Sequence, residues 1–254
     1  MRIQYVSDLH LERYDNAVYI SRNPLDVVGD ILVIAGDTFP LREFEGYKKH
    51  IFFDWCAANF RETLLIPGNH EYYGSNVDAF PGAWRREIRP NVAMYQNKRV
   101  RIDNFDFILS TLWTHVPGRD WLAVKMGMQD FRTIRTNAGS FTAYDYNIIH
   151  RCDLYFIQDA VSESDAEHKV VVTHHVPSFR CVSPEFKDSR LHAVFAVDLT
   201  DLIERSGVDA WIYGHSHRSI EMTIGKTRML SNQLGYVVYR EYNNGYKSNK
   251  YIDI

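Results

Sequence analysis

Short apolar, β-branched runs recur along the chain, and each of them stops at polar or turn-forming residues. Five such runs are "IQYV", "DILVIAG", "TLLI", "KVVVT" and "VDAWIYG", and they end before Ser7, Asp37, Pro67, His174 and His215 respectively. A sixth run, "FDFILSTLW", leads to Thr114 and His115. Runs of this length, bounded by turn residues, are typical of buried strands. The pattern therefore predicts a core built on several short strands.

Segments with helical character separate these predicted strands. They include "EGYKKHIFFDWCAANF", "NIIHRCDLYFIQDAVSES" and "VDLTDLIERSG", and residues 219–254 predict short strands and hairpins with a turn at "NNG". Alternating strands and helices predict an α/β layer structure, and the strand-rich middle and tail predict a second sheet. No Gly-, Pro- or Ser-rich linker divides the chain, so we expect one domain over residues 1–254. Residues 113–146 are rich in aromatic side chains and have few strand or helix signals. This pattern predicts one of two things: an insert that acts as a lid or specificity loop, or a small core beneath a loop.

Composition narrows the classes of protein further. The chain of 254 residues is long enough to bury a core without metals or disulfides. Its formal net charge of -3 gives no basic field for nucleic acid or an anionic membrane surface. The three scattered cysteines fit reduced thiols and form no CxxC motif. With no signal-peptide pattern and no membrane-spanning apolar run, we expect a cytoplasmic protein that does not enter a membrane.

Polar side chains follow almost every predicted strand. They are Asp8 and His10, Asp37, Asn69 and His70, His174, and then His215 and His217. Ligands of open α/β sheets bind at the carboxyl ends of the strands, so we expect one site drawn from five segments. The two pairs spaced two residues apart are expected to project to one side of extended backbone, with Leu9 in the core.

Glycine directly precedes Asp37, Asn69 and His215. Because glycine lacks a Cβ atom, we expect the chain to turn sharply there, or another group to approach closely.

The donor chemistry of these residues favours metal ions. Nitrogen and oxygen donors without thiolate suit Mn, Fe, Zn, Ni or similar divalent ions. Seven ligand side chains are too many for one tetrahedral ion, and they suit two ions that share a bridging carboxylate. Such a site is net positive and attracts phosphate, and a metal pair lowers the pKa of bound water to roughly 7.

The segments "SDLH", "GDT", "GNHE", "THH" and "GHSH", in this order between residues 7 and 217, resemble the five blocks of the calcineurin-like metallophosphoesterases. The resemblance implies a four-layer α/β/β/α sandwich, in which two facing mixed sheets are flanked by helices. It also implies a dinuclear centre, with Asp8, His10 and His217 on one metal, with Asn69, His174 and His215 on the other, and with Asp37 as the bridge.

By the same resemblance, His70 is the catalytic histidine that binds no metal, and it assists the leaving group. We therefore expect a two-metal hydrolase of phosphodiesters or phosphomonoesters, in which a metal-bridging hydroxide attacks phosphorus and Asp37 holds both metals. The expected substrate is a phosphorylated small molecule.

Four further residues are candidates for substrate contact. Tyr73 is a candidate wall residue beside His70, and His115 stands at another strand end. His175 either touches the substrate or belongs to the core, since in a continuing strand it points away from His174. Arg132 either anchors a phosphate or belongs to a salt-bridged surface loop.

Rival functions remain at this point. A non-catalytic scaffold could use the same fold, although all seven ligand positions are present here. A nucleotide pyrophosphatase is less consistent with His70, because some lipid A-pathway pyrophosphatases of this family carry arginine at that position. The absence of a basic groove disfavours a nuclease, and "GDTFPLR" lacks the arginine pattern "GDxVDRG" of the protein phosphatases.

Overall fold

Two six-stranded sheets face each other in the computed structural model, which describes residues 1–186 and 189–254. The first sheet has the order β14 (Tyr251–Asp253), β1 (Arg2–Val6), β2 (Ile31–Ala35), β3 (Glu62–Ile66), β5 (Val92–Gln96) and β4 (Trp84–Arg89). The second has the order β12 (Met222–Ile224), β13 (Thr227–Ser231), β11 (Ala210–Tyr213), β10 (His168–Val172), β7 (Phe105–Leu109) and β6 (Lys98–Ile102). In each sheet the four inner strands are parallel and both edge strands are antiparallel.

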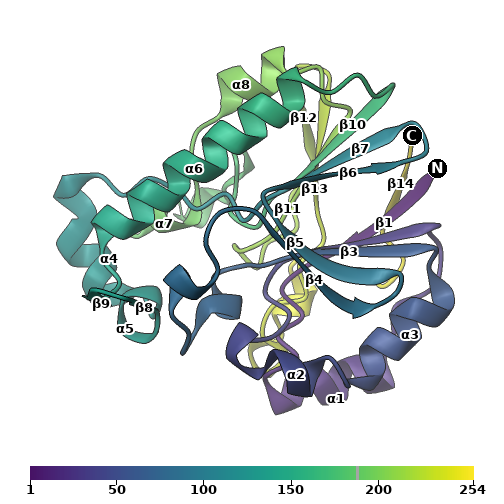
Figure 1. Ribbon diagram of the computed structural model, residues 1–254, viewed down its shortest axis with the longest axis horizontal. Helices are drawn as coiled ribbons and strands as arrows, with labels where there is room; N and C mark the ends of the chain where they lie inside the picture. The colour runs from purple at the N-terminus through teal and green to yellow at the C-terminus, as the bar shows by residue number, and fades with distance from the viewer. Residues whose placement is uncertain (187–188) are drawn as a thin grey trace.

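Helices cover the outer faces of both sheets (Figure 1). On the first sheet lie α1 (Tyr14–Arg22), α2 (Phe44–Tyr47) and α3 (Ile51–Asn59), and on the second lie α6 (Ala143–Ser162) and α8 (Thr200–Arg205). Single turns of 3₁₀ helix are η1 (Leu41–Glu43), η2 (His70–Tyr72), η3 (Val77–Ala79), η5 (Phe179–Cys181), η6 (Pro184–Phe186), η7 (Val237–Tyr239) and η8 (Glu241–Asn243). The predicted four-layer sandwich of mixed sheets is confirmed.

The alternation of side chains along each strand explains why the strands read as continuous apolar runs. In β2, Leu32 and Ile34 pack against the helices, whereas Ile31, Val33 and Ala35 pack into the space between the sheets. The second sheet repeats this division, because alternate residues of β10 and β11 face α6 and α8 or the opposite sheet. Both faces of each inner strand are therefore buried, as parallel strands require.

The aromatic insert at residues 113–146 forms a small layer at the end of the molecule opposite both chain termini (Figure 1). It contains η4 (Gly118–Asp120), α4 (Trp121–Gly127), α5 (Asp130–Thr133) and the short hairpin of β8 (Arg135–Thr136) and β9 (Gly139–Ser140). Its aromatic side chains pack on one another: the ring centroids of Trp113 and Tyr146 are 4.9 Å apart, and those of Phe131 and Phe141 are 5.9 Å apart. These side chains continue the hydrophobic cluster on the outer face of the first sheet, with the Tyr72 and Trp113 ring centroids 5.6 Å apart. The action of the insert as a lid stays a prediction.

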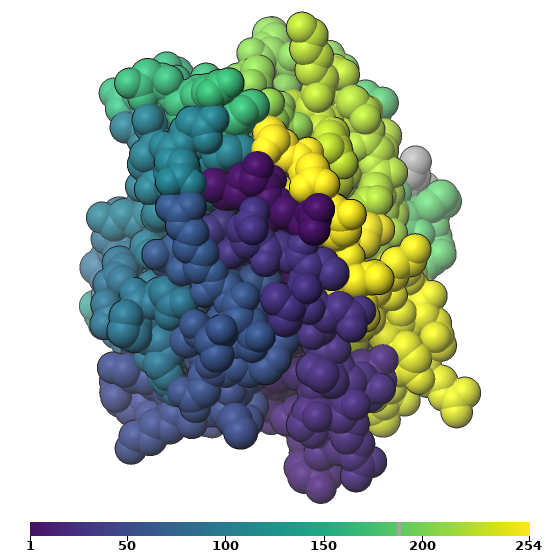
Figure 2. Space-filling view, turned by 90° about the vertical axis from the view of Figure 1, so that its right-hand side faces the viewer, coloured from purple at the N-terminus to yellow at the C-terminus, as the bar shows by residue number. Residues whose placement is uncertain are grey.

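The two ends of the chain lie side by side. β14 pairs antiparallel with β1, and the Met1 ammonium donates a hydrogen bond to the Ile254 carbonyl at 2.7 Å. Figure 2 shows this face, with the C-terminal residues in yellow beside the N-terminal residues in purple. Among the helices of the described residues, none has both the length and the apolar character needed to cross a bilayer.

Replacing Trp211 tests the packing between the second sheet and its helices. Its side chain is fully buried, and Nε1 donates a hydrogen bond to Thr173 Oγ1 at 3.0 Å. Because Trp211→Ala leaves a large cavity, we expect it to lower the free energy of unfolding by about 3–5 kcal/mol in urea denaturation. The control Leu122→Ala, at a site that is 68% exposed, should change that free energy by less than about 0.5 kcal/mol. Equal effects of both substitutions would contradict this packing.

Candidate metal centre

The five polar segments meet at one place, at the carboxyl ends of the inner strands. Three of them follow β1, β2 and β3 of the first sheet, and two follow β10 and β11 of the second. All seven predicted ligand side chains are buried or nearly so, and they comprise Asp8, His10, Asp37, Asn69, His174, His215 and His217. The structure thus brings together every residue of the expected ligand set.

One half of this cluster joins the loops that follow β1 and β11. The Nε2 atoms of His10 and His217 lie 3.1 Å apart, and Asp8 Oδ1 lies 3.5 Å from His217 Nε2. These three side chains offer donor atoms within 4.8 Å of one another. That spacing fits one cation with two imidazole ligands and a carboxylate.

The other half joins the loops that follow β3, β10 and β11. His174 Nε2 lies 3.1 Å from Asn69 Oδ1 and 3.1 Å from His215 Nδ1. The three donor atoms of Asp37, His174 and His215 again lie within 4.8 Å of one another. A second cation fits here, with two imidazoles and an amide oxygen.

Asp37 lies between the two halves. Its Oδ2 atom is 3.7 Å from His10 Nε2, while its Oδ1 atom is 3.4 Å from His174 Nε2. One carboxylate therefore turns one oxygen toward each half. This arrangement and the nitrogen and oxygen donor set both fit a pair of divalent ions.

The backbone at these residues is unusual. Asp8, His10, Asp37, His215 and His217 have φ angles of 56°, 46°, 55°, 76° and 49°. The expectation that the paired residues lie on extended backbone is therefore wrong, because a left-handed residue redirects each side chain individually. Leu9 is fully buried in the core, as predicted. Non-glycine residues with positive φ cluster at functional sites, where the surrounding structure enforces them.

Glycines permit the tight approach of the loops, as predicted. A Cβ atom at Gly68 would clash with Asp37 Oδ1, and one at Gly36, which has a φ of 89°, would clash with the His174 ring. Both residues must be glycine for Asp37 and His174 to reach the centre.

A second row of carboxylates holds the ligand loops in place. Glu71 accepts hydrogen bonds from the backbone N–H groups of Asp37, Thr38, Phe39 and Gly68, at 3.0, 2.6, 3.2 and 2.6 Å. It therefore ties the loop after β2 to the loop after β3. Three more carboxylates contact site residues: Glu12 contacts His10, Glu241 contacts His217, and Asp130 accepts from Asn69.

These supporting residues were not predicted from the sequence. Glu71 stands inside the "GNHE" block and Glu12 stands two residues after His10. Their nearness in sequence to candidate ligands could therefore have indicated both of them as supporting residues. Glu241 and Tyr236 come from the tail after β13, where no motif marks them.

His70 lies beside the cluster with both ring nitrogens engaged. Nδ1 is 3.1 Å from Glu12 Oε1, and Nε2 is 3.2 Å from the Tyr236 hydroxyl. The Tyr73 ring packs on it, with centroids 4.2 Å apart. The same Glu12 oxygen is 3.1 Å from His10 Nδ1, so one carboxylate orients both imidazoles.

The electrostatics of the centre favour added positive charge. Burial raises the pKa of Asp37, but the charges of His174 and His70 more than offset this and hold that pKa well below its usual range. Burial lowers the pKa of His217, whereas its contacts with Asp8 and Glu241 raise it to about 10. Burial also raises the pKa of Asp8, but its hydrogen bond with His217 more than offsets this and lowers that pKa. Both buried carboxylates, Asp8 and Asp37, thus stay ionised and attract cations.

A cavity of about 720 Å³ opens onto the cluster. Its charged wall includes Glu12, Arg13 and Glu241, and its apolar wall includes Met128 and Phe195. Residues of the 113–146 insert, from Gly127 to Gln129, also line it. The cavity is large enough for a small molecule.

The four candidates for substrate contact are placed differently. Tyr73 lines the cavity, whereas His115, Arg132 and His175 are absent from its described lining. His175 is buried behind His215, and its Nε2 atom lies 3.2 Å from the Tyr146 hydroxyl. Arg132 donates a hydrogen bond to the Met126 carbonyl, and His115 lines a separate cavity of about 450 Å³.

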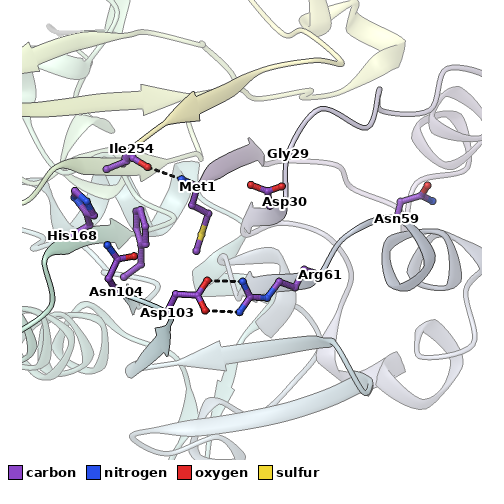
Figure 3. A pocket seen from close by; sticks show the side chains of 10 residues that line it. Met1, Gly29, Asp30, Asn59, Arg61, Asp103, Asn104, His168 and Ile254 are labelled. Carbon is purple, nitrogen blue, oxygen red and sulfur yellow. Dashed lines mark hydrogen bonds and ion pairs between the residues drawn. The ribbon is translucent and has the colours of Figure 1, made fainter.

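Another cavity, of about 540 Å³, lies at the opposite ends of the strands, beside both termini (Figure 3). Arg61 and Asp103 pair across it through two hydrogen bonds of 2.5 and 2.7 Å. The Arg61 guanidinium is already neutralised by the Asp103 carboxylate. The described lining of this cavity contains none of the seven candidate metal ligands. We therefore place the functional site at the carboxyl ends.

Comparison with known proteins agrees with this fold. A protein of Acanthamoeba polyphaga mimivirus, named "Uncharacterized protein L509", is 28% identical over 287 residues, covering 100% of this chain and 97% of its own length. The crystal structure of phosphopantetheinyl hydrolase (PptH) from Mycobacterium tuberculosis superposes with a TM-score of 0.72 at 15% identity, covering 98% of this chain and 95% of the other.

The match to a protein family covers most of the chain. Residues 1–219 match the family described as "Calcineurin-like phosphoesterase", and this span contains all five polar segments and both halves of the cluster. The chain therefore belongs to the calcineurin-like phosphoesterase family.

Proposed function

We propose that this protein hydrolyses phosphate esters of small molecules with the help of two divalent metal ions. Membership of the family supports a metal-dependent phosphoester hydrolase. The observation that carries the proposal is the position of Asp37, whose two oxygens face the two separate groups of histidines. A non-catalytic scaffold would have no need for this complete and buried donor set.

The residues divide into two ligand sets. Asp8, His10 and His217 would hold one ion, Asn69, His174 and His215 would hold the other, and Asp37 would bridge them. When bound, two such ions supply Lewis acidity toward a water molecule and the phosphoryl oxygens. Mn, Fe, Zn and Ni all accept this mixture of nitrogen and oxygen donors.

His70 is suited to act on the leaving group. It lines the cavity without belonging to either ligand set, and Glu12 binds its Nδ1 atom. Glu12 thereby selects the tautomer in which Nδ1 carries the hydrogen, and protonation then occurs at Nε2. Nε2 lies near the Tyr236 hydroxyl and can transfer a proton to the departing oxygen of the ester.

The substrate is proposed to be a phosphomonoester or a phosphodiester of a small molecule. The cavity of about 720 Å³ fits a ligand of that size. Its charged wall offers the guanidinium of Arg13, which packs over the Tyr236 ring at 4.7 Å.

Replacing Asp37 tests the bridging role. Asp37→Ala should lose bound metal. Because removing a residue that only supports a metal ligand already lowers activity by roughly 10- to 100-fold, the loss of Asp37 should lower turnover of 4-nitrophenyl phosphate esters by more than that. Metal content is measured by elemental analysis of protein purified without chelators. Asp30→Ala is a matched control, because Asp30 stands at the opposite end of β2 and should leave both quantities unchanged. An Asp37→Ala variant with full metal and activity would refute the bridge.

Replacing His70 separates chemistry from metal binding. His70→Ala should lower turnover by about 10²- to 10⁴-fold while the metal content stays at the wild-type level. The loss should be larger for esters of alkyl alcohols than for esters of 4-nitrophenol, because poor leaving groups depend more on protonation. His168→Ala, at the start of β10, serves as control. Loss of metal from His70→Ala would show that His70 is a ligand instead.

A further inference from the structure

A smaller cavity with almost wholly apolar walls adjoins the metal centre. It has a volume of about 200 Å³, and its described lining includes Val176, Val182, Leu191, Phe195 and Ser216. Val176 follows the His174–His175 pair by one residue, and Phe195 ends α7 (His192–Phe195). The neighbouring cavity at the metal centre, in contrast, is walled on one side by charged groups.

The two cavities share part of their walls. Phe186, Phe195 and Ser216 line both of them. Ser216 stands between the ligand residues His215 and His217, and the ring centroids of Phe195 and His215 are 4.8 Å apart. The two cavities therefore adjoin each other directly beside His215.

Backbone hydrogen bonds fix the apolar walls to the metal centre. Val176 N–H donates to the Phe195 carbonyl at 3.1 Å, and Val197 N–H donates to the Val176 carbonyl at 3.0 Å. The Val194 carbonyl lies 3.2 Å from His215 Nε2. The helix α7 thus both lines the apolar cavity and supports a metal ligand, so the distance between the two is set by the fold.

We propose that the substrate is a phosphate ester with an alkyl or aryl group that enters this apolar cavity, an inference that rests on the proposed function. The phosphate would meet the buried cluster, and the apolar group would replace water along Val176, Val182 and Leu191. A phosphate ester whose other groups are all small or charged makes no use of these walls. Burial of apolar surface then supplies selectivity that the metal centre cannot provide.

Binding of phosphonates, which are not hydrolysed, tests this proposal without relying on turnover. Protein loaded with Mn²⁺ is titrated by calorimetry with n-alkylphosphonates from methyl to hexyl. The dissociation constant should fall by about fourfold for each methylene group that enters the cavity, and it should then level off. Hydrolysis of the matching alkyl 4-nitrophenyl phosphates and alkyl phosphates is measured in parallel.

Two matched variants locate the effect. Leu191 contacts the cavity and lies against Gly127, so Leu191→Trp should fill the space and bring the hexyl-to-methyl affinity ratio close to one. Leu122→Trp places the same side chain on α4, at a position that is 68% exposed, and should keep the wild-type ratio. The wild-type series decides the question alone if Leu191→Trp does not fold.

The outcomes distinguish the two proposals. Equal affinity for all chain lengths, together with hydrolysis of phosphate esters, would overturn the apolar site and leave the proposed function intact. Affinity that grows with chain length without hydrolysis of any ester would support the cavity and overturn the hydrolase. A full chain-length effect in Leu191→Trp would also overturn the assignment of this cavity.

Discussion

Burial of two carboxylates at the junction of the two sheets is the constraint on which the rest of the site depends. Asp8 and Asp37 are almost inaccessible to solvent, and an unpaired charge in such a place is very costly. Backbone N–H groups of His215 and His70 donate to them at 3.1 and 3.0 Å, and imidazoles surround them. These contacts offset part of the cost, and bound cations would offset the remainder.

The fold supports this concentration of charge by making the strand ends rigid. Left-handed φ angles at non-glycine residues cost of order 1–3 kcal/mol each, and several of them adjoin one another here. The apolar layer between the sheets and the hydrogen bonds to Glu71 hold them in place. Because that stabilisation comes from the scaffold, the donor atoms are positioned before a ligand arrives.

Local patterns in the sequence predicted the α/β layers and the gathering of polar side chains at one site, since buried parallel strands and polar strand ends both leave strong signals. The four-layer arrangement was predicted by the resemblance to a family, and the division of the polar residues into two ligand sets stays a prediction. The sequence was insufficient for the local backbone, because Asp8 and His10 look like an extended pair and adopt positive φ instead. It also missed Tyr236 and Glu241, whose contacts with His70 and His217 arise only from tertiary folding. The apolar cavity next to His215 likewise joins segments whose proximity no local pattern indicates.

The site joins residues from nearly the whole length of the polypeptide, and this has a kinetic consequence. The hydrogen bond from His215 to Asp8 spans 207 residues, and the contact between Tyr236 and His70 spans 166. Contacts of such sequence separation form late, because the entropy lost on closing long loops must be met first. Metal ions should accordingly leave the rate of folding almost unchanged and act on the native state by slowing its unfolding.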